Sequence, residues 1–229
     1  MTQSIKCWST CLVLALIVFS CARDVSENVN QDSIFTEYRL VNDADQDKTF
    51  ARATFRFGGA TGTILDLTDP AVVTLDGDLL TYKPLFGYFE KDFAGELAGG
   101  TFSYTDLDNS TFENAVSLSS AISLPTALDS ISQGEAFSLE WLGDPVGEDE
   151  SVIVTINGIN EGDAQIFTTT DQGANAIVLA QNKLTELGIG EARVFIERWT
   201  NQELGQATGE GGAVWSRYIT GPMLVQITE

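Results

Sequence analysis

Apolar and polar residues alternate along most of the chain from residue 35 onward. Phe55 and Phe57 flank Arg56, and the same alternation runs back to Ala51. Successive side chains of a strand point to opposite faces, so a period of two predicts strands with one buried face. Further stretches of this kind lie at 72–75, 79–85, 88–93, 101–107 and 111–118, with Gly, Pro and Asp between them. This first half predicts seven or eight antiparallel strands.

A second set of strands is expected after Pro125. Residues 119–134 contain five Ser, with one Asp and one Gly, and no long apolar run, so we place a domain boundary between residues 120 and 121. Expected strands lie at 137–141, 152–156, 165–169, 192–199 and 214–227. Trp141 is expected to pack between two sheets. One short helix is expected at 179–187, ending before Gly188, which favours a left-handed cap.

The order of elements in the second half resembles a known kind of module. A strand, a short helix, a glycine and the strand segment 191–197 resemble the connection between two late strands in bacterial immunoglobulin-like modules. The first half resembles these modules less closely. The expected fold class is therefore all-β, with two antiparallel β-sandwich (immunoglobulin-like) domains at 34–120 and 121–229.

The chain begins with features of a bacterial signal peptide. Residues 11–19 are apolar, Lys6 precedes them, and the chain turns polar at Arg23 and Asp24. A helix needs about 20 apolar residues to cross a bilayer, so this run is too short for a membrane anchor. We therefore expect residues 1–20 to be a cleaved signal peptide.

Residues 18–21, Val-Phe-Ser-Cys, resemble the lipobox of bacterial lipoproteins. The resemblance implies that Cys21 is acylated and becomes the mature N-terminus, which attaches the protein to a membrane. Residues 21–33 are polar and are expected to form a flexible spacer. Asp24, Glu27 and Asp32 are similar to the acidic export signal of Bacteroidota surface lipoproteins, which implies a location in the bacterial envelope at the outer membrane.

The charge of the chain argues against nucleic acid as a partner. The chain has 12 Lys and Arg against 33 Asp and Glu, a net charge of −21, and the loss of Lys6 with the leader makes it one unit more negative. The cations are scattered through the sequence, with no run that predicts a basic patch. The acidity itself indicates solubility or, alternatively, cation binding.

The residue inventory also excludes several kinds of catalysis. The chain has no His, and its three Cys residues, at positions 7, 11 and 21, all lie in or at the end of the leader. The body therefore has no Ser-His-Asp triad, no Cys nucleophile and no His-ligated zinc or haem. Glycoside hydrolysis by two carboxylates is the enzymatic alternative, but no acidic pair stands out. We expect that the protein is not an enzyme.

Calcium is the one cofactor that the acidic stretches allow. Asp43, Asp45 and Asp47 are spaced as at the start of a calcium loop, and Asp106 and Asp108 lie at an expected hairpin end. A third acidic stretch spans residues 144–150. Lys48 and Thr54 occupy the positions where an EF-hand needs Gly and Glu, which excludes that motif. Asp and Asn are also ordinary turn formers, so metal binding and turn formation both stay open.

Aromatic residues gather in one expected hairpin and offer another surface for binding; they are Tyr82, Phe86, Tyr88, Phe89 and Phe93. Such rings either fill a core or stack against sugars and protein partners. From these features we expect a non-catalytic binding or adhesion module of the envelope, with a glycan or protein partner. The alternatives are a carboxylate-dependent glycan-active enzyme and a structural subunit of an envelope complex.

Overall fold

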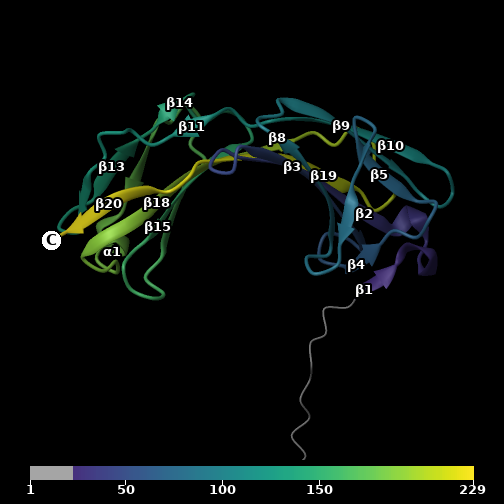
Figure 1. The fold of residues 1–229 in the computed structure, drawn as a ribbon, viewed down its shortest axis with the longest axis horizontal. Coiled ribbons are helices and arrows are strands. Elements are labelled where there is room, and N and C mark those ends of the chain that lie inside the picture. Colours follow the sequence, from purple (N-terminus) through teal and green to yellow (C-terminus); the bar gives the residue numbers. More distant parts are fainter. Residues whose placement is uncertain (1–22) are drawn as a thin grey trace, which may run out of the picture.

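The computed structural model describes residues 23–229, and these residues fold almost entirely into β-strands (Figure 1). The expected all-β class with sandwich packing is confirmed. The leader and Cys21 lie outside the described residues. Among residues 23–229, no helix has the length and apolar character needed to cross a bilayer.

The elements of the first half begin with a short strand and two 3-10 turns. They are β1 (Arg23–Val25), η1 (Ser26–Asn28), η2 (Gln31–Ser33), β2 (Ile34–Asp43), β3 (Lys48–Phe57), β4 (Thr63–Asp66), β5 (Val72–Leu75), β6 (Asp78–Leu79), β7 (Thr81–Lys83), β8 (Tyr88–Ala94), β9 (Gly99–Thr105) and β10 (Thr111–Ser117).

The second half contains ten strands and one helix of a single turn. They are β11 (Ile122–Ser123), β12 (Ser130–Ser132), β13 (Phe137–Glu140), β14 (Leu142–Gly143), β15 (Glu150–Asn157), β16 (Gln165–Thr169), β17 (Ala176–Leu179), α1 (Gln181–Leu184), β18 (Gly190–Gln202), β19 (Gly212–Ile219) and β20 (Met223–Thr228). The helix expected at 179–187 is correct in place but shorter at both ends, because Leu179 belongs to β17 and the residues after Leu184 form a turn.

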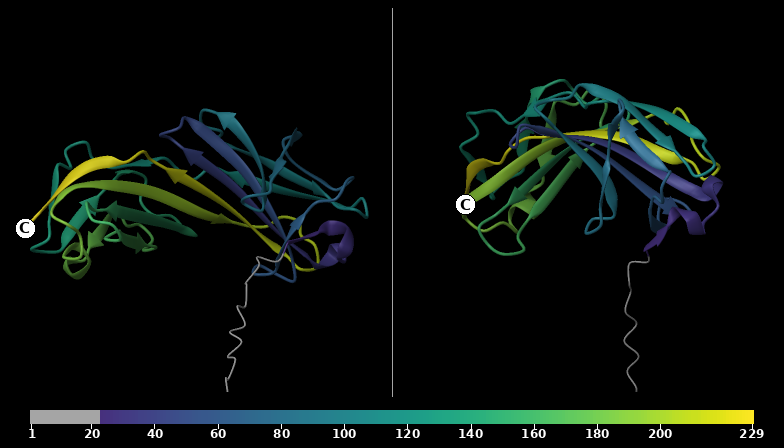
Figure 2. Two further views of the ribbon diagram at one scale, coloured as in Figure 1. Left: turned by 60° about the horizontal axis from the view of Figure 1, so that its bottom comes forward. Right: turned by 45° about the vertical axis from the view of Figure 1, so that its right-hand side comes forward.

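One large sheet runs through both halves of the molecule. Its main path is β1-β4-β3-β2-β19-β18-β15-β16, and β2 and β19 pair in parallel from Thr36 with Gly212 to Asp43 with Ile219. We call it the continuous sheet. In Figures 1 and 2 the smaller sheets lie on the outer side of its bend, and the continuous sheet lies on the inner side.

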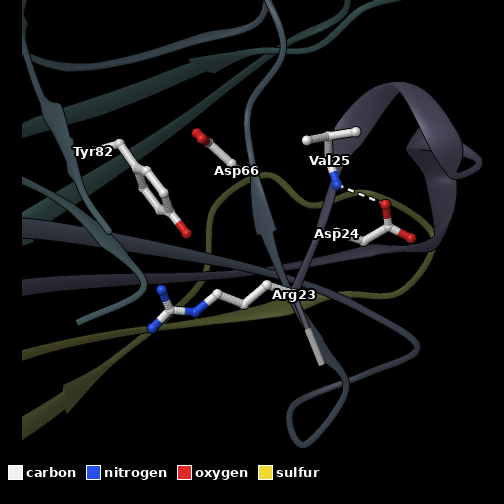
Figure 3. Close-up of a pocket in the computed structure, with 5 residues that line it drawn as sticks. All are labelled: Arg23, Asp24, Val25, Asp66 and Tyr82. Atoms are coloured by element: carbon white, nitrogen blue, oxygen red, sulfur yellow. Dashed lines mark hydrogen bonds between the residues drawn. The ribbon is translucent and has the colours of Figure 1, made fainter. Parts of the chain in front are cut away.

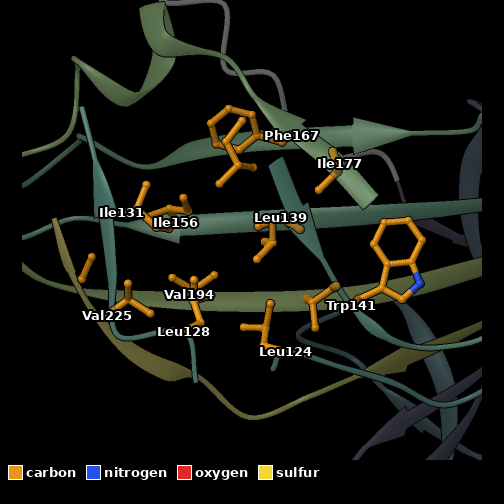
Figure 4. Packing of buried hydrophobic residues seen from close by; sticks show 14 of the residues in the cluster. Leu124, Leu128, Ile131, Leu139, Trp141, Ile156, Phe167, Ile177, Val194 and Val225 are labelled. Atoms are coloured by element: carbon orange, nitrogen blue, oxygen red, sulfur yellow. The ribbon is translucent and has the colours of Figure 1, made fainter. Parts of the chain in front are cut away.

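Two apolar cores lie between the continuous sheet and these smaller sheets. The first includes Tyr38, Phe55 and Phe102 and lies under the sheet β10-β9-β5-β6. The second, shown in Figure 4, contains Trp141 as expected and lies under β11-β14 and β13-β17. Alternation explains both cores, since the inward positions of each strand are apolar.

Residues from the second half complete the first core. Val214 of β19 is buried there and Leu204 packs against it. Ser119 and Ser216 are also joined, with their hydroxyl oxygens 2.9 Å apart. The boundary expected between residues 120 and 121 therefore separates segments that share a sheet and a core.

The segment expected as a flexible spacer is folded from Arg23 onward. β1 pairs in parallel with β4, and Ser26 is fully buried, where its hydroxyl accepts a hydrogen bond from the Thr68 amide at 2.8 Å. The Gln31 side chain donates to the Ser26 carbonyl oxygen at 2.8 Å. These polar side chains satisfy buried backbone groups, which is why a segment poor in apolar residues is nevertheless ordered.

Candidate binding face

Within residues 23–229 no second layer covers the inner face of the continuous sheet, and this face carries a row of planar side chains. Outward-pointing positions of β2, β3, β8, β18 and β19 contribute them. We call this row the aromatic–arginine ladder; its members are Phe50, Arg52, Tyr88, Arg39, Trp215, Trp199 and Arg217. All seven are partly exposed.

The ladder is held together by stacking. The rings of Trp199 and Trp215 lie 4.5 Å apart at an interplanar angle of 27°. The Arg39 guanidinium lies 5.5 Å from the Trp215 ring and 5.4 Å from the Tyr88 ring. Arg217 lies over Trp199 at 5.1 Å. These distances are within the range of cation–π attraction, about 6 Å.

Arg52 extends the ladder across β3. Its guanidinium lies 5.1 Å from the Tyr88 ring and 5.0 Å from the Phe50 ring. Because the rings stack mostly on one another and on guanidinium groups, a ligand would meet ring edges and N–H groups. The face therefore offers hydrogen-bond donors more than free stacking surfaces.

Three carboxylates fix the arginines in place. Arg52 Nε donates to Glu90 Oε2 at 2.7 Å, and Arg217 pairs with Glu197. Glu37 accepts from Arg56 Nη1 at 2.8 Å and from Trp215 Nε1 at 3.0 Å. These cross-strand contacts limit the rotamers of the side chains and so preorganise the face.

The electrostatics of Glu37 and Arg39 follow from this packing. Burial raises the pKa of Glu37, but the hydrogen bonds from Arg56 and Trp215 and the charges of Arg39 and Arg56 outweigh it, so the pKa lies below its ordinary value. Burial lowers the pKa of Arg39. Arg39 Nη2 donates to Thr54 Oγ1 at 2.8 Å.

The sequence does not reveal this concentration of cations. Four of the twelve Lys and Arg residues of the chain lie in the ladder or beside it, namely Arg39, Arg52, Arg56 and Arg217. Three glutamates oppose them, so the face is close to neutral in a protein of net charge −21. Arg39, Arg52 and Arg56 lie on the paired strands β2 and β3, and the β2–β19 pairing brings Trp215 and Arg217 next to them from the far end of the sequence.

A small pocket of about 320 Å³ lies at the N-terminal end and is lined by Arg23, Asp24, Val25, Asp66 and Tyr82 (Figure 3). The hydrogen bonds from the Asn28 side chain and the Val25 amide, at 2.7 and 2.8 Å, lower the pKa of Asp24. Burial raises the pKa of Asp66. In Figure 3 the Asp24 carboxylate turns toward the Val25 amide and away from Asp66, so the two acids do not converge as a glycosidase pair does.

The aspartates considered for calcium lie in turns. Asp43 Oδ1 accepts from the amides of Asp45 and Gln46 at 3.1 and 3.2 Å, and Asp47 has a left-handed φ of 51°. Within residues 23–229 no group of three or more His, Cys, Asp or Glu side chains has a metal-binding arrangement.

The two other acidic stretches also have structural contacts. Asp106 Oδ1 accepts from the amides of Asp108 and Ser110 at 2.9 and 2.8 Å. In the stretch 144–150, Glu150 Oε2 accepts from Arg198 at 2.8 Å. The first stretch shapes a turn, and the second neutralises a buried arginine.

The aromatic hairpin is divided between core and surface. Phe89 is buried, while Tyr82 and Phe93 pack against the first core. Tyr88 belongs to the ladder, and Phe86 is exposed and stacks on it at 5.5 Å.

Comparisons with known proteins add little. No protein-family model and no curated protein matches the chain. Among solved structures, the chain is similar to a chain of a 1.5-MDa bacterial ice-binding adhesin studied for host cell surface retention, at 12% identity and a TM-score of 0.24. That match covers 84% of this chain and 66% of the adhesin chain. We draw no role from a similarity at this level.

Proposed function

We propose that the chain is a lipid-anchored bacterial envelope protein that binds a glycan without catalysis, through the inner face of the continuous sheet. The observation that carries the proposal is the aromatic–arginine ladder, in which guanidinium groups are held rigid by stacking and by carboxylates. A rigid binding surface loses little side-chain entropy when a ligand binds.

The chemistry of the face favours a ligand rich in oxygen. Each guanidinium has five N–H donors, and the protein contacts described above engage only one group of each ladder arginine. The Nε groups of Arg39 and Arg217 are buried, and sugar hydroxyls and sugar carboxylates are suitable acceptors for the remaining Nη groups. The near-neutral charge of the face also spares such a ligand the repulsion of the acidic surface elsewhere.

Glycan binding is tested with the intact lipidated protein in detergent, applied to an array of neutral, uronic-acid-containing and sulfated oligosaccharides. Arg52→Gln removes a ladder guanidinium and is expected to weaken binding about tenfold, the size of one charge-assisted hydrogen bond. Lys91→Gln is the control and should leave binding unchanged, because Lys91 of β8 points to the opposite face of the sheet from Tyr88 and pairs with Asp78 of β6 at 3.8 Å.

Two results would refute the ligand-binding proposal. One is the absence of binding to every glycan on the array by a protein with a normal melting curve. The other is equal weakening by both variants, which would show that the ladder has no special role.

The anchor is tested separately. The apolar run followed by Cys21 and a polar chain supports acylation, and Cys21→Ser should move the protein from the membrane fraction to the soluble fraction. A variant that stays with the membranes would contradict a lipid anchor at this residue.

A further inference from the structure

The turn between β7 and β8 exposes two adjacent large apolar residues. Leu85 is 81% exposed and Phe86 is 62% exposed. The other large apolar side chains that are exposed within residues 23–229 are isolated in the sequence. The turn is well ordered, because the amides of Phe86 and Gly87 both donate to the Lys83 carbonyl oxygen, at 3.0 and 2.9 Å. This exposed pair is therefore held in position by the fold.

The turn is fixed against the first described residues of the chain. The Arg23 guanidinium donates to the carbonyl oxygens of Pro84 and Leu85, the latter at 3.2 Å. Gly87 has a φ of +73° and lies so close to Ile64 that an added Cβ would be 3.1 Å from Ile64 Cδ1. Ile64 is also the strand partner of Arg23. The apolar turn and the N-terminal strand thus form one end of the molecule.

The attachment residue is close to this end. Cys21 precedes Arg23 by two residues, and two residues span about 7 Å at most. Since the chain is folded from Arg23 onward, no long spacer separates the turn from an acyl chain on Cys21.

We propose that Leu85 and Phe86 insert into the interfacial region of the phospholipid bilayer that holds the acylated Cys21. The inference rests on the proposed lipid anchor and adds a second, protein-borne membrane contact that fixes the orientation of the body. Large apolar side chains next to cationic ones are typical of membrane-interface contacts.

The local charge is compatible with such a contact. The Arg23 guanidinium, which contacts the turn, lines the neighbouring pocket together with Asp24 and Asp66, and Lys83 at the start of the turn lies 4.0 Å from Glu90. This end therefore lacks the strong negative charge of the protein as a whole, which anionic phospholipids would repel.

The test places an environment-sensitive fluorophore at the turn. Leu85→Cys and, as control, Leu224→Cys are labelled with a nitrobenzoxadiazole probe in the full lipidated protein; Leu224 is an exposed apolar residue of β20, 56% exposed. Apart from Cys21, the mature chain has no thiol to compete for the label. The proteins are reconstituted into vesicles of phosphatidylethanolamine and phosphatidylglycerol that contain a doxyl-labelled lipid.

The expected result is a blue-shifted emission and quenching by the doxyl lipid at position 85, with neither effect at position 224. Quenching by aqueous iodide that is equal at both positions, in protein that floats with the vesicles, overturns the inference and leaves the anchor intact. Wild-type protein that does not float, or that takes up label at Cys21, refutes the anchor and the inference with it.

Discussion

Trp199 and Trp215 stack on each other but differ in their hydrogen bonds. Trp215 Nε1 donates to Glu37, whereas Trp199 Nε1 is buried and has no hydrogen-bond partner among residues 23–229. Replacement by Phe keeps an aromatic ring and removes the N–H. We expect Trp215→Phe to lower the free energy of unfolding by about 1 kcal/mol more than Trp199→Phe does, because only the former breaks a hydrogen bond. Urea unfolding of both variants measures the difference, and equal losses would contradict it.

Ionised Glu37 should make the free energy of unfolding depend on pH. Its pKa is lower in the folded protein than its ordinary value of 4.5, so its ionised form stabilises the fold above that pH. The contribution is lost as pH falls through the folded pKa. Glu37→Gln is therefore expected to cost about 2 kcal/mol at pH 7.

The gap in stability between Glu37→Gln and wild type should shrink in acid. Urea unfolding at a series of pH values from 7 downward measures it. A gap that stays constant below pH 4 would show that ionised Glu37 does not stabilise the ladder.

For single residues, the sequence predicts which face of a strand a side chain lies on better than it predicts which residues that side chain contacts. Alternation places Arg52 and Arg56 on the polar face of a strand, and the structure has them there. It does not predict that Arg39 meets Trp215, because that contact depends on a pairing between strands almost the whole chain apart. The sequence also does not decide whether the aspartates bind metal or form turns, since both use the same residues.

Strand β18 is stabilised by an ion pair buried beneath its inner face. Arg198 is 1% exposed, and it donates to Glu150 Oε2 at 2.8 Å and to the carbonyl oxygens of Asp144 and Pro145. Removing one partner leaves a buried charge uncompensated, which costs about 3–5 kcal/mol. Glu150→Ala should lower the free energy of unfolding by that amount.

Glu148 is an exposed acid of the same loop and provides the control. Glu148→Ala should change stability by no more than about 0.5 kcal/mol. Equal effects of the two substitutions in urea unfolding would show that the Arg198 pair does not stabilise β18.

The strands themselves were partly predictable. Residues 72–75 and 165–169 match β5 and β16, because Gly, Pro and Asp bound these runs clearly. Residues 79–85 and 214–227 were each expected to form one strand, but each is divided between two. The first is divided between β6 and β7, and the second between β19 and β20, with Gly221 and Pro222 in the interval. The expected helix was too long because Leu184 and Leu187 are buried with helical spacing, although only one helical turn forms.

At the scale of the whole molecule, the sequence predicts two sandwiches and the structure has two cores. What the sequence did not predict is how they join. β19 leaves the second half and pairs in parallel with β2, and local alternation contains no information about which distant strand lies alongside. The same pairing brings Trp215 and Arg217 to the arginines of β2 and β3, so the sequence predicts neither the connection between the two halves nor this part of the ladder.

The shared sheet leads to a prediction about separate halves. Residues 23–120 retain β1 to β10 but lack β19, so the β2 edge loses its partner and Val214 is absent from the first core. An unpaired edge and a missing core residue together destabilise a domain of this size. We expect this fragment not to fold cooperatively alone, and to regain a cooperative thermal transition when residues 121–229 are added as a second chain that supplies β19. Circular dichroism melting of each fragment and of the mixture measures this. A cooperative melt of residues 23–120 alone, unchanged by the second fragment, would show that the halves are independent domains and that the β2–β19 pairing only connects them.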